Sequence, residues 1–211
     1  MKKEQDDLRA IREMMERSSK FLSLSGLSGI MAGVAALAGA LFAHLYLLRD
    51  PSATGFSRFH EWMILLADAV VVLTLAVGSG LWFSWRKARR RGVRLLDRTT
   101  LRTLYNLALP LVVGGSFCVV MLLRGEVLLV IAGTLIFYGL ALVNVSKYTY
   151  GEIHWLGITE IALGLAAAVV GGHGLVFWSL GFGVCHIVYG AIMYLKYDKQ
   201  REEVDDGQPD R

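Results

Sequence analysis

Six apolar runs, each near the length that crosses a lipid bilayer, occupy most of the chain between residues 21 and 197. A membrane-spanning α-helix needs about 20 consecutive residues that are mostly apolar. A soluble domain of this size disperses its charges along its helices and rarely contains such runs. The sequence has three prolines and no period-two alternation, which argues against a β-barrel. We therefore predict an all-α integral membrane protein.

The breaks between the runs divide the chain into an arm, one membrane domain and a tail. The breaks at 124–126 and 171–174 are short, and short turns make successive helices antiparallel neighbours. We expect three antiparallel hairpins over 21–197, preceded by an arm at 1–20 and followed by a polar, disordered tail at 198–211. The first run is too long for a signal peptide, so we expect it to remain as the first span. The predicted spans are 21–48, 60–85, 103–123, 127–146, 153–172 and 174–195.

The arm has the pattern of an amphipathic helix over residues 4–20. Leu8, Ile11, Met14 and Met15 recur at helical spacing, and acidic residues occupy the first turn, where the helix dipole favours them. We expect this cytoplasmic helix to lie on the membrane surface or to pack on the bundle. A docking site for a protein partner is the alternative.

Lysine and arginine gather on one side of the predicted topology. Of the 22 such residues, 19 fall in the arm, the second and fourth connections and the C-terminal segment. The positive-inside rule then places both termini in the cytoplasm of a bacterial inner membrane. The basic segment 86–102 lacks a nucleic-acid-binding pattern, so we expect it to contact anionic lipid headgroups instead. The residues assigned to this contact are Arg86, Lys87, Arg89, Arg90 and Arg91.

Residues 26–40 and 157–171 are similar to each other. Their glycines and alanines recur at the same positions, with Gly33 matching Gly164. Both segments enter the membrane from the same side, so a repeat would be parallel rather than inverted. Small residues let helix backbones approach closely, which places Glu160 on a packing face of its helix.

Two pairs of ionisable residues are expected at membrane depth. Asp68 and His44 lie at similar depths on the first two spans, and Glu160 and His186 lie at similar depths on the last two. Burial of an acid in a membrane is costly, so each is expected to contact a partner. Such pairs could relay protons, or they could fix helix packing.

Other polar or helix-breaking residues also lie within the predicted spans. Asn144 and Tyr189 could join Glu160 and His186. Pro110 lies within the third span and has no backbone N–H, so the carbonyl group of Asn106 loses its helical partner. The sequence predicts a kink at this point.

Motifs of catalysis and of cofactor binding are not found in the sequence. No nucleophile elbow, zinc-protease motif, P-loop or dinucleotide fingerprint occurs, and we expect no catalytic residue, no bound cofactor and no metal ligand. We interpret Cys118 and Cys185 as small buried apolar side chains. Five histidines without ligand spacing leave a haem or metal site as the least favoured alternative.

Two segments carry a resemblance to known proteins. The sequences KFLSLSGLSGIMAG (20–33) and GFGVCHIVYGAIMYLKY (181–197) resemble those of uncharacterised small six-helix bacterial inner-membrane proteins. The three Gly-rich hairpins are similar, more loosely, to the six-helix acid-resistance membrane-protein family. The resemblance covers nearly the whole chain and implies a six-helix inner-membrane protein, but it transfers no functional residue.

Three functions are consistent with the sequence. The leading hypothesis is a non-enzymatic interaction protein or stress-related accessory component. The second is a small proton-linked transporter or channel that uses Asp68, Glu160, His44 and His186. The third is a haem- or metal-binding membrane protein. The sequence leaves open whether the chain forms a homo-oligomer.

Overall fold

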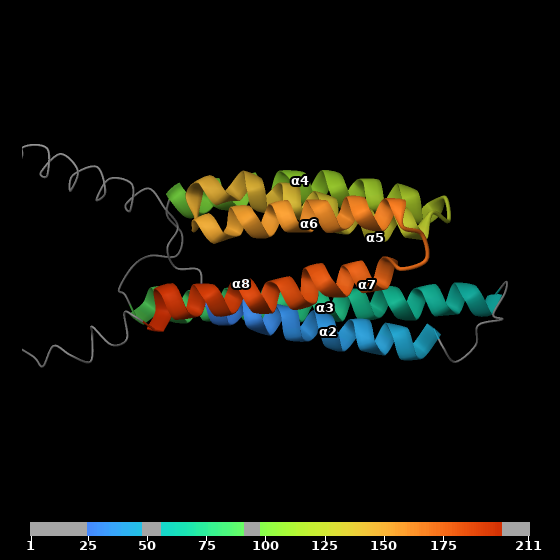
Figure 1. The fold of residues 1–211 in the computed structure, drawn as a ribbon, viewed down its shortest axis with the longest axis horizontal. Coiled ribbons are helices and arrows are strands. Elements are labelled where there is room, and N and C mark those ends of the chain that lie inside the picture. The colour runs from blue at the N-terminus through green and yellow to red at the C-terminus, as the bar shows by residue number, and fades with distance from the viewer. Residues whose placement is uncertain (1–24, 48–55, 91–97, 200–211) are drawn as a thin grey trace, which may run out of the picture.

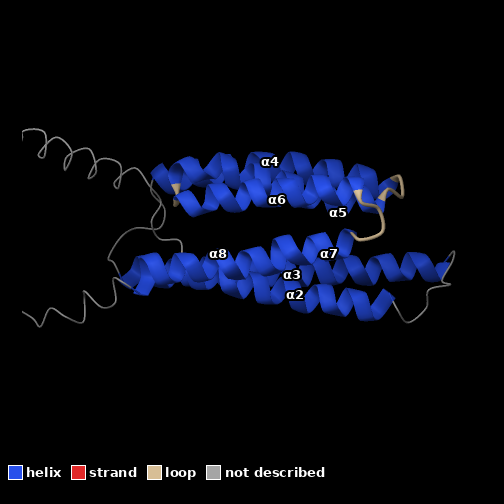
Figure 2. Ribbon diagram, viewed as in Figure 1, coloured by secondary structure: helices blue, strands red, loops and turns tan. Residues whose placement is uncertain are grey.

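Helices make up almost all of the described chain. The computed structural model describes residues 25–47, 56–90 and 98–199. The first five rods are α2 (Gly26–Leu47), α3 (Phe56–Arg90), α4 (Arg98–Leu123), α5 (Val127–Val145) and α6 (Gly151–Val169), with the short η1 (Ser146–Tyr148) following α5 (Figure 2). The last rod is the continuous run of α7 (Gly174–Trp178), the π-helical η2 (Ser179–Cys185), α8 (His186–Met193) and the π-helical η3 (Tyr194–Lys199).

The six rods are long and apolar enough to cross a membrane, which confirms the predicted all-α multi-pass architecture. α3 continues beyond its predicted span to Arg90, so part of the basic segment is helical. Asp198 and Lys199, which were assigned to the tail, belong to η3. The predicted amphipathic helix at 4–20 and the rest of the tail lie outside the described residues.

Apolar side chains cover the outer surface of the bundle. On α3, Leu73 and Leu81 are 62% and 68% exposed, and on α4, Val112 is 66% exposed. Soluble monomers rarely expose so much contiguous apolar surface to water. This apolar surface is therefore consistent with a protein that is surrounded by lipid.

The rods form two bodies of three helices each (Figure 1). The first body contains α2, α3 and the last rod, and the second contains α4, α5 and α6. The predicted hairpins α2–α3 and α4–α5 are present. The helices of the third predicted hairpin are also in contact, but α6 packs mainly on α5 and the last rod packs mainly on α2. The turn at 170–173 therefore crosses from one body to the other.

Glycines explain why the last rod packs on α2. A Cβ atom on Gly33 would lie 2.6 Å from the carbonyl oxygen of Gly183 and 3.0 Å from the backbone nitrogen of Ile187. A Cβ atom on Gly190 would lie 2.8 Å from the carbonyl oxygen of Gly26. The two backbones thus approach more closely than any larger residue permits, and dispersion contacts between them replace the missing side chains.

α6 packs on α5 in an equivalent way. A Cβ atom on Gly164 would lie 2.9 Å from the carbonyl oxygen of Ala132 and 3.0 Å from the backbone nitrogen of Ile136. These contacts parallel those of Gly33, which matches Gly164 in the repeat of 26–40 and 157–171. The repeat therefore has a structural counterpart, one tightly packed helix pair in each body.

The partner helices of the two pairs also share a sequence. Residues 136–139 read Ile-Phe-Tyr-Gly in α5, and residues 187–190 read Ile-Val-Tyr-Gly in α8. We align residues 26–40 with 157–171, and residues 187–190 with 136–139. In this alignment Glu160 occupies the position of Gly29, and His186 occupies the position of Leu135. The acid and the imidazole thus stand where the other helix pair has a glycine and a leucine.

Candidate functional site

Glu160 lies on α6 at the boundary between the two bodies. Its side chain is fully buried, with 0% exposure. It faces η2, where a Cβ atom on Gly181 would lie 3.2 Å from Cδ of Glu160 and 2.6 Å from Cδ2 of Leu135. Glycine at 181 therefore makes the space that the carboxyl group fills.

His186 provides the nearest polar group to Glu160 and comes from the other body. Its Nδ1 atom lies 3.4 Å from Oε1 of Glu160 and 3.0 Å from the carbonyl oxygen of Gly181. The predicted proximity of Glu160 and His186 is therefore present. The imidazole is buried, with 7% of the residue exposed.

Tyr138 of α5 completes the site. Its hydroxyl oxygen lies 2.8 Å from Nε2 of His186, and the two rings stack with their centroids 5.4 Å apart. The ring of Phe182 also stacks on His186, at 5.9 Å. Aromatic rings thus hold the imidazole in one orientation and keep its surroundings apolar.

The hydrogen bonds of His186 leave the carboxyl group of Glu160 without a partner. In the neutral tautomer with hydrogen on Nδ1, this N–H donates to the carbonyl of Gly181, and Nε2 accepts from the hydroxyl of Tyr138. Neither oxygen of Glu160 has a hydrogen-bond partner among the described residues. The 3.4 Å separation from Nδ1 allows an ionic attraction, but it exceeds the 2.7–2.9 Å typical of a charge-assisted hydrogen bond.

The burial of this pair disfavours an uncompensated negative charge. A carboxylate that is buried without a counter-charge or hydrogen bonds is strongly disfavoured in an apolar interior. A proton on Glu160, or a proton on His186 opposite an ionised Glu160, keeps the pair electrically neutral. Loss of that proton leaves one buried negative charge, which this arrangement does not stabilise.

The π-helical segment η2 shapes the site from the last rod. It spans Ser179–Cys185 and ends at His186, and its Gly181 and Gly183 are both buried. The carbonyl of Gly181 accepts from the side chain of His186. Single π-helical turns within α-helices are frequent at functional sites, because they redirect side chains and free backbone groups.

Asn144 lies outside this site, contrary to the prediction. Its Nδ2 atom donates to the carbonyl oxygen of Asn106 at 2.9 Å and lies 3.3 Å from Oδ1 of the same residue. That carbonyl is the one that Pro110 leaves without a backbone donor. Asn144 therefore serves the packing of α4 on α5.

The predicted contact between Asp68 and His44 is wrong for the described structure. Asp68 is half-buried against α2, where a Cβ atom on Gly39 would lie 3.3 Å from its Oδ2 atom. His44 is five residues further along α2, about 7.5 Å nearer the end of the helix. No hydrogen bond or ion pair joins the two side chains in the described ranges. His44 instead lines a shallow cavity of about 520 Å³ together with His173 and Ser179.

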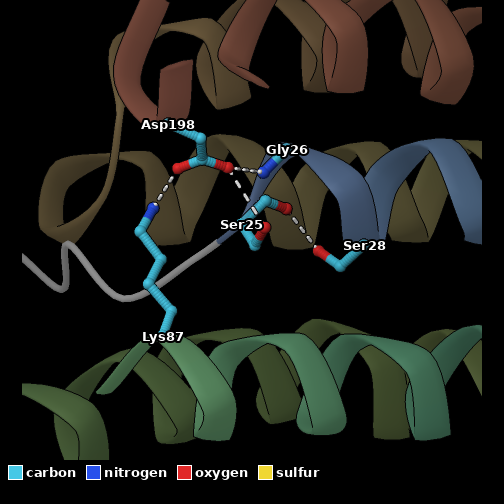
Figure 3. A network of polar contacts seen from close by, with 5 residues as sticks. All are labelled: Ser25, Gly26, Ser28, Lys87 and Asp198. Atoms are coloured by element: carbon cyan, nitrogen blue, oxygen red, sulfur yellow. Dashed lines mark hydrogen bonds and ion pairs between the residues drawn. The ribbon is translucent and has the colours of Figure 1, made fainter. Parts of the chain in front are cut away.

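Lys87 departs from its predicted role as a lipid-headgroup contact. We call the end of the bundle where α2 begins and the last rod ends the basic end. There, Nζ of Lys87 lies 2.6 Å from Oδ1 of Asp198, and the Lys87 side chain is only 13% exposed. Oδ2 of Asp198 accepts from the backbone N–H of Gly26 at 2.9 Å and from the hydroxyl of Ser25 at 3.1 Å (Figure 3). Asp198 therefore connects α2, α3 and η3, all within the first body.

The other predicted headgroup contacts keep their solvent-facing positions where they are described. Arg86 and Arg89 are exposed, and the guanidinium of Arg89 lies 5.3 Å from the ring centroid of Trp85. A cation beside an exposed tryptophan is typical of a membrane interface. The side chain of Arg90 and the whole of Arg91 lie outside the described residues.

A second polar network at the basic end joins the two bodies. Glu152 of α6 accepts from Nζ of Lys196 at 2.6 Å and from the hydroxyl of Tyr197, which lies 3.0 Å from each of its oxygens. The rings of Tyr150 and Tyr197 stack with centroids 4.2 Å apart. These residues were not predicted as a site, because they lie at the ends of the predicted spans.

Comparison with known proteins gives no relative: no family model, no curated protein and no solved structure matches the chain. The resemblance to six-helix inner-membrane proteins stays an expectation drawn from the residues. Within residues 25–47, 56–90 and 98–199, no three His, Cys, Asp or Glu side chains gather so that they could hold a metal ion. Function is therefore inferred from the geometry of the site itself.

Tyr138 and Gly181 were not predicted from the sequence. The signal for Tyr138 was the shared Ile-x-Tyr-Gly sequence, since Tyr138 and Tyr189 occupy equivalent positions in it. Tyr189 was considered for the site, but it packs instead against an apolar cluster nearer the basic end. The importance of Gly181 depends on the approach of Glu160 from another helix, which no local pattern records.

Proposed function

We propose that this chain is a small proton-linked membrane transport protein, a transporter or a channel, in which Glu160 and His186 bind and release the coupling proton. The observation that carries the proposal is the complete burial of a carboxyl group that has no hydrogen-bond partner among the described residues and lies beside an imidazole from the other body. An ionisable residue inside a membrane domain is a functional candidate by default, because burying it is costly.

Release of the proton from the pair is expected to be coupled to a movement of the two bodies relative to each other. A buried, unpartnered carboxylate is stable only if water or a counter-charge reaches it. Glu160 comes from the second body, and His186 comes from the first, so a shift of one body against the other changes the surroundings of both groups. Proton release and a change in the boundary between the bodies are therefore expected to be thermodynamically coupled.

The test is proton flux through the purified, reconstituted protein. Liposomes that contain a pH-sensitive dye are exposed to a pH gradient, with valinomycin and potassium to control the membrane potential. We expect flux in the wild type and its loss in Glu160→Gln, which keeps the shape of the side chain but removes its titration. Asp68→Asn is the matched control, since Asp68 is an acid at membrane depth that does not contact His186, and this variant should retain flux.

Two results would count against the proposal. Absence of wild-type flux under every imposed pH and potential gradient would remove proton transport. Equal flux in the wild type and Glu160→Gln would assign the pair to helix packing, in which case the variant should differ in thermal stability alone.

The type of membrane and the orientation of the chain within it are also part of the proposal. The distribution of Lys and Arg supports a bacterial inner membrane with both termini in the cytoplasm, so that the basic end is the cytoplasmic end. Exposed Arg86 and Arg89 would then contact anionic headgroups. We further propose that the chain acts without enzymatic activity and without a cofactor.

An interaction role remains a separate prediction. It depends on the arm at 1–20, which lies outside the described residues. Deletion of the arm should abolish recovery of a partner without unfolding the bundle, and unchanged recovery would contradict that role. This experiment is independent of proton flux.

A further inference from the structure

We infer that Glu152, Lys196 and Tyr197 form a gate that closes the basic end of the boundary between the two bodies and separates Glu160 and His186 from the water at that end. The inference rests on the proposed function, because a gate matters only if protons or water reach the pair. Its test measures access to the site rather than proton flux, so the two proposals can fail independently.

The three gate residues join the bodies at their rim. Glu152 lies in the first turn of α6, and Lys196 and Tyr197 lie on η3 at the end of the last rod. One carboxylate accepts from both partners, at 2.6 Å from Nζ of Lys196 and at 3.0 Å from the hydroxyl of Tyr197. Because both bonds share this one acceptor, a change at Glu152 weakens both hydrogen bonds that the gate makes between the two bodies.

An apolar layer lies between the gate and the proton-binding pair. Glu152 and Glu160 are eight residues apart on α6, about 12 Å along the helix. The intervening space is filled by the buried cluster of Leu142, Val145, Tyr150, Ile153, Leu156 and Met193. Side chains from both bodies meet in this layer, so the gate must hold the bodies together for the layer to exclude water.

The boundary between the bodies is suited to movement because its packing differs from that inside each body. Within the bodies, glycines bring helix backbones into direct contact, as at Gly33 with Gly183 and at Gly164 with Ala132. Across the boundary, the contacts at the site and at the gate run through side chains, such as Tyr138 with His186 and Glu152 with Lys196. Side-chain contacts rearrange by rotamer changes, whereas interlocked backbones move together as one body.

The gate can open readily because its ion pair meets solvent. The side chain of Lys196 is 56% exposed and that of Glu152 is 15% exposed. Exposed ion pairs contribute little net stability, since water competes for both charges. The closed and open boundaries are therefore expected to differ little in free energy.

Asp198 provides an internal comparison at the same end of the protein. It lies one residue from Tyr197 on η3, and its Oδ1 atom pairs with Lys87 at 2.6 Å. The described partners of Asp198 belong to the first body, whereas Glu152 belongs to the second. Lys87 in turn lies over the ring of Tyr150 at the start of α6, 5.8 Å from its centroid. Asp198→Asn keeps an oxygen that accepts from Lys87, so this variant should loosen η3 locally without separating the two bodies.

Cys185 is a natural reporter of access to the site. It directly precedes His186, is partly buried and packs against the apolar layer. The other cysteine, Cys118, is removed as Cys118→Ala so that one thiol remains. A membrane-impermeant maleimide is added to sealed vesicles of each orientation, and the modified fraction of Cys185 is followed over time by intact-mass spectrometry.

We expect slow modification of Cys185 from the basic end in the parent protein. Glu152→Gln should accelerate the reaction roughly two- to fivefold from that end alone, which is the population shift that loss of an exposed ion pair can produce. Tyr197→Phe, a milder change that keeps the ring stacked on Tyr150, should give a smaller acceleration in the same direction. Asp198→Asn should leave the rate unchanged.

Three outcomes would overturn the gate. Rapid modification in the parent protein would show that the layer is already open. Unchanged rates in both Glu152→Gln and Tyr197→Phe would show that these residues do not control access. Equal acceleration in Asp198→Asn would show that the variants only fray η3. Size-exclusion elution of each variant as the parent species establishes that the fold is intact.

Discussion

Asn144 on α5 donates its side-chain amide to the backbone carbonyl of Asn106 on α4, at 2.9 Å. Pro110 leaves this carbonyl without its helical donor. A helix interruption in one segment is thus compensated by a side chain from another. In a membrane, where no water can substitute, such compensation is what makes an internal proline tolerable.

Replacement of Asn144 should therefore depend on Pro110. We expect Asn144→Ala to lower the free energy of unfolding by about 1 kcal/mol, since hydrogen bonds between membrane helices are of this order. In a Pro110→Ala background, the restored backbone N–H satisfies Asn106, and Asn144→Ala should then cost close to nothing. A double-mutant cycle, measured by reversible unfolding in mixed micelles, checks this coupling. Equal costs in both backgrounds would contradict the assignment of Asn144 to this carbonyl.

Loss of the hydroxyl of Tyr138 should change the tautomer of His186. In the neutral tautomer with hydrogen on Nδ1, this N–H donates to the carbonyl of Gly181 and Nε2 accepts from the hydroxyl of Tyr138. Tyr138→Phe removes the donor, so a population with hydrogen on Nε2 should appear. Nitrogen-15 NMR of histidine-labelled protein distinguishes the two tautomers. Tyr189→Phe is the matched control, because Tyr189 occupies the equivalent position in the repeat and makes no hydrogen bond to His186 in the described structure; it should leave the spectrum of His186 unchanged.

Gly181→Ala should destabilise the protein and disrupt the site. The new methyl group would contact Oε2 of Glu160 and lie 2.6 Å from Leu135. Forced overpacking of this kind costs about 1–3 kcal/mol. Gly78→Ala is the control, since a Cβ atom on Gly78 meets nothing within 4 Å, and it should be neutral or slightly stabilising. Combining Gly181→Ala with Glu160→Ala should recover part of the loss in a thermal unfolding assay; no recovery would place the strain elsewhere.

Both ends of the protein should lie on the cytoplasmic side. A green fluorescent protein fused after Arg211 should fluoresce in intact bacterial cells, because this reporter does not fold after export through the general secretory route. An alkaline phosphatase inserted at Gly125, in the turn between α4 and α5, should instead be active, since the opposite end is then periplasmic. The reverse pattern of activities would invert the proposed orientation.

The similarity of sequence between 26–40 and 157–171 indicated that two helices pack in the same manner, and the glycine contacts of Gly33 and Gly164 agree with that prediction. It did not indicate which helices they pack on. The short turn at 170–173 favoured α6 beside the last rod, yet backbone contact through glycine couples α6 to α5 and the last rod to α2. Chain connectivity limits which helices can be neighbours, but shape complementarity selects among them.

The sequence by itself determined the lipid solvent, the helical class and the approximate depth of Glu160 and His186, because apolar run length and helical rise are local properties. Their similar depth in the membrane predicted the contact of Glu160 with His186 correctly, because their helices also meet at the boundary between the bodies. It failed for Asp68 and His44, which no hydrogen bond or ion pair joins in the described structure, and for Asn144, whose partner was a carbonyl that a proline had freed. Only the tertiary structure decided which neighbouring helix each packing face meets, because that choice is set by the interlocking of side chains from segments far apart in the chain.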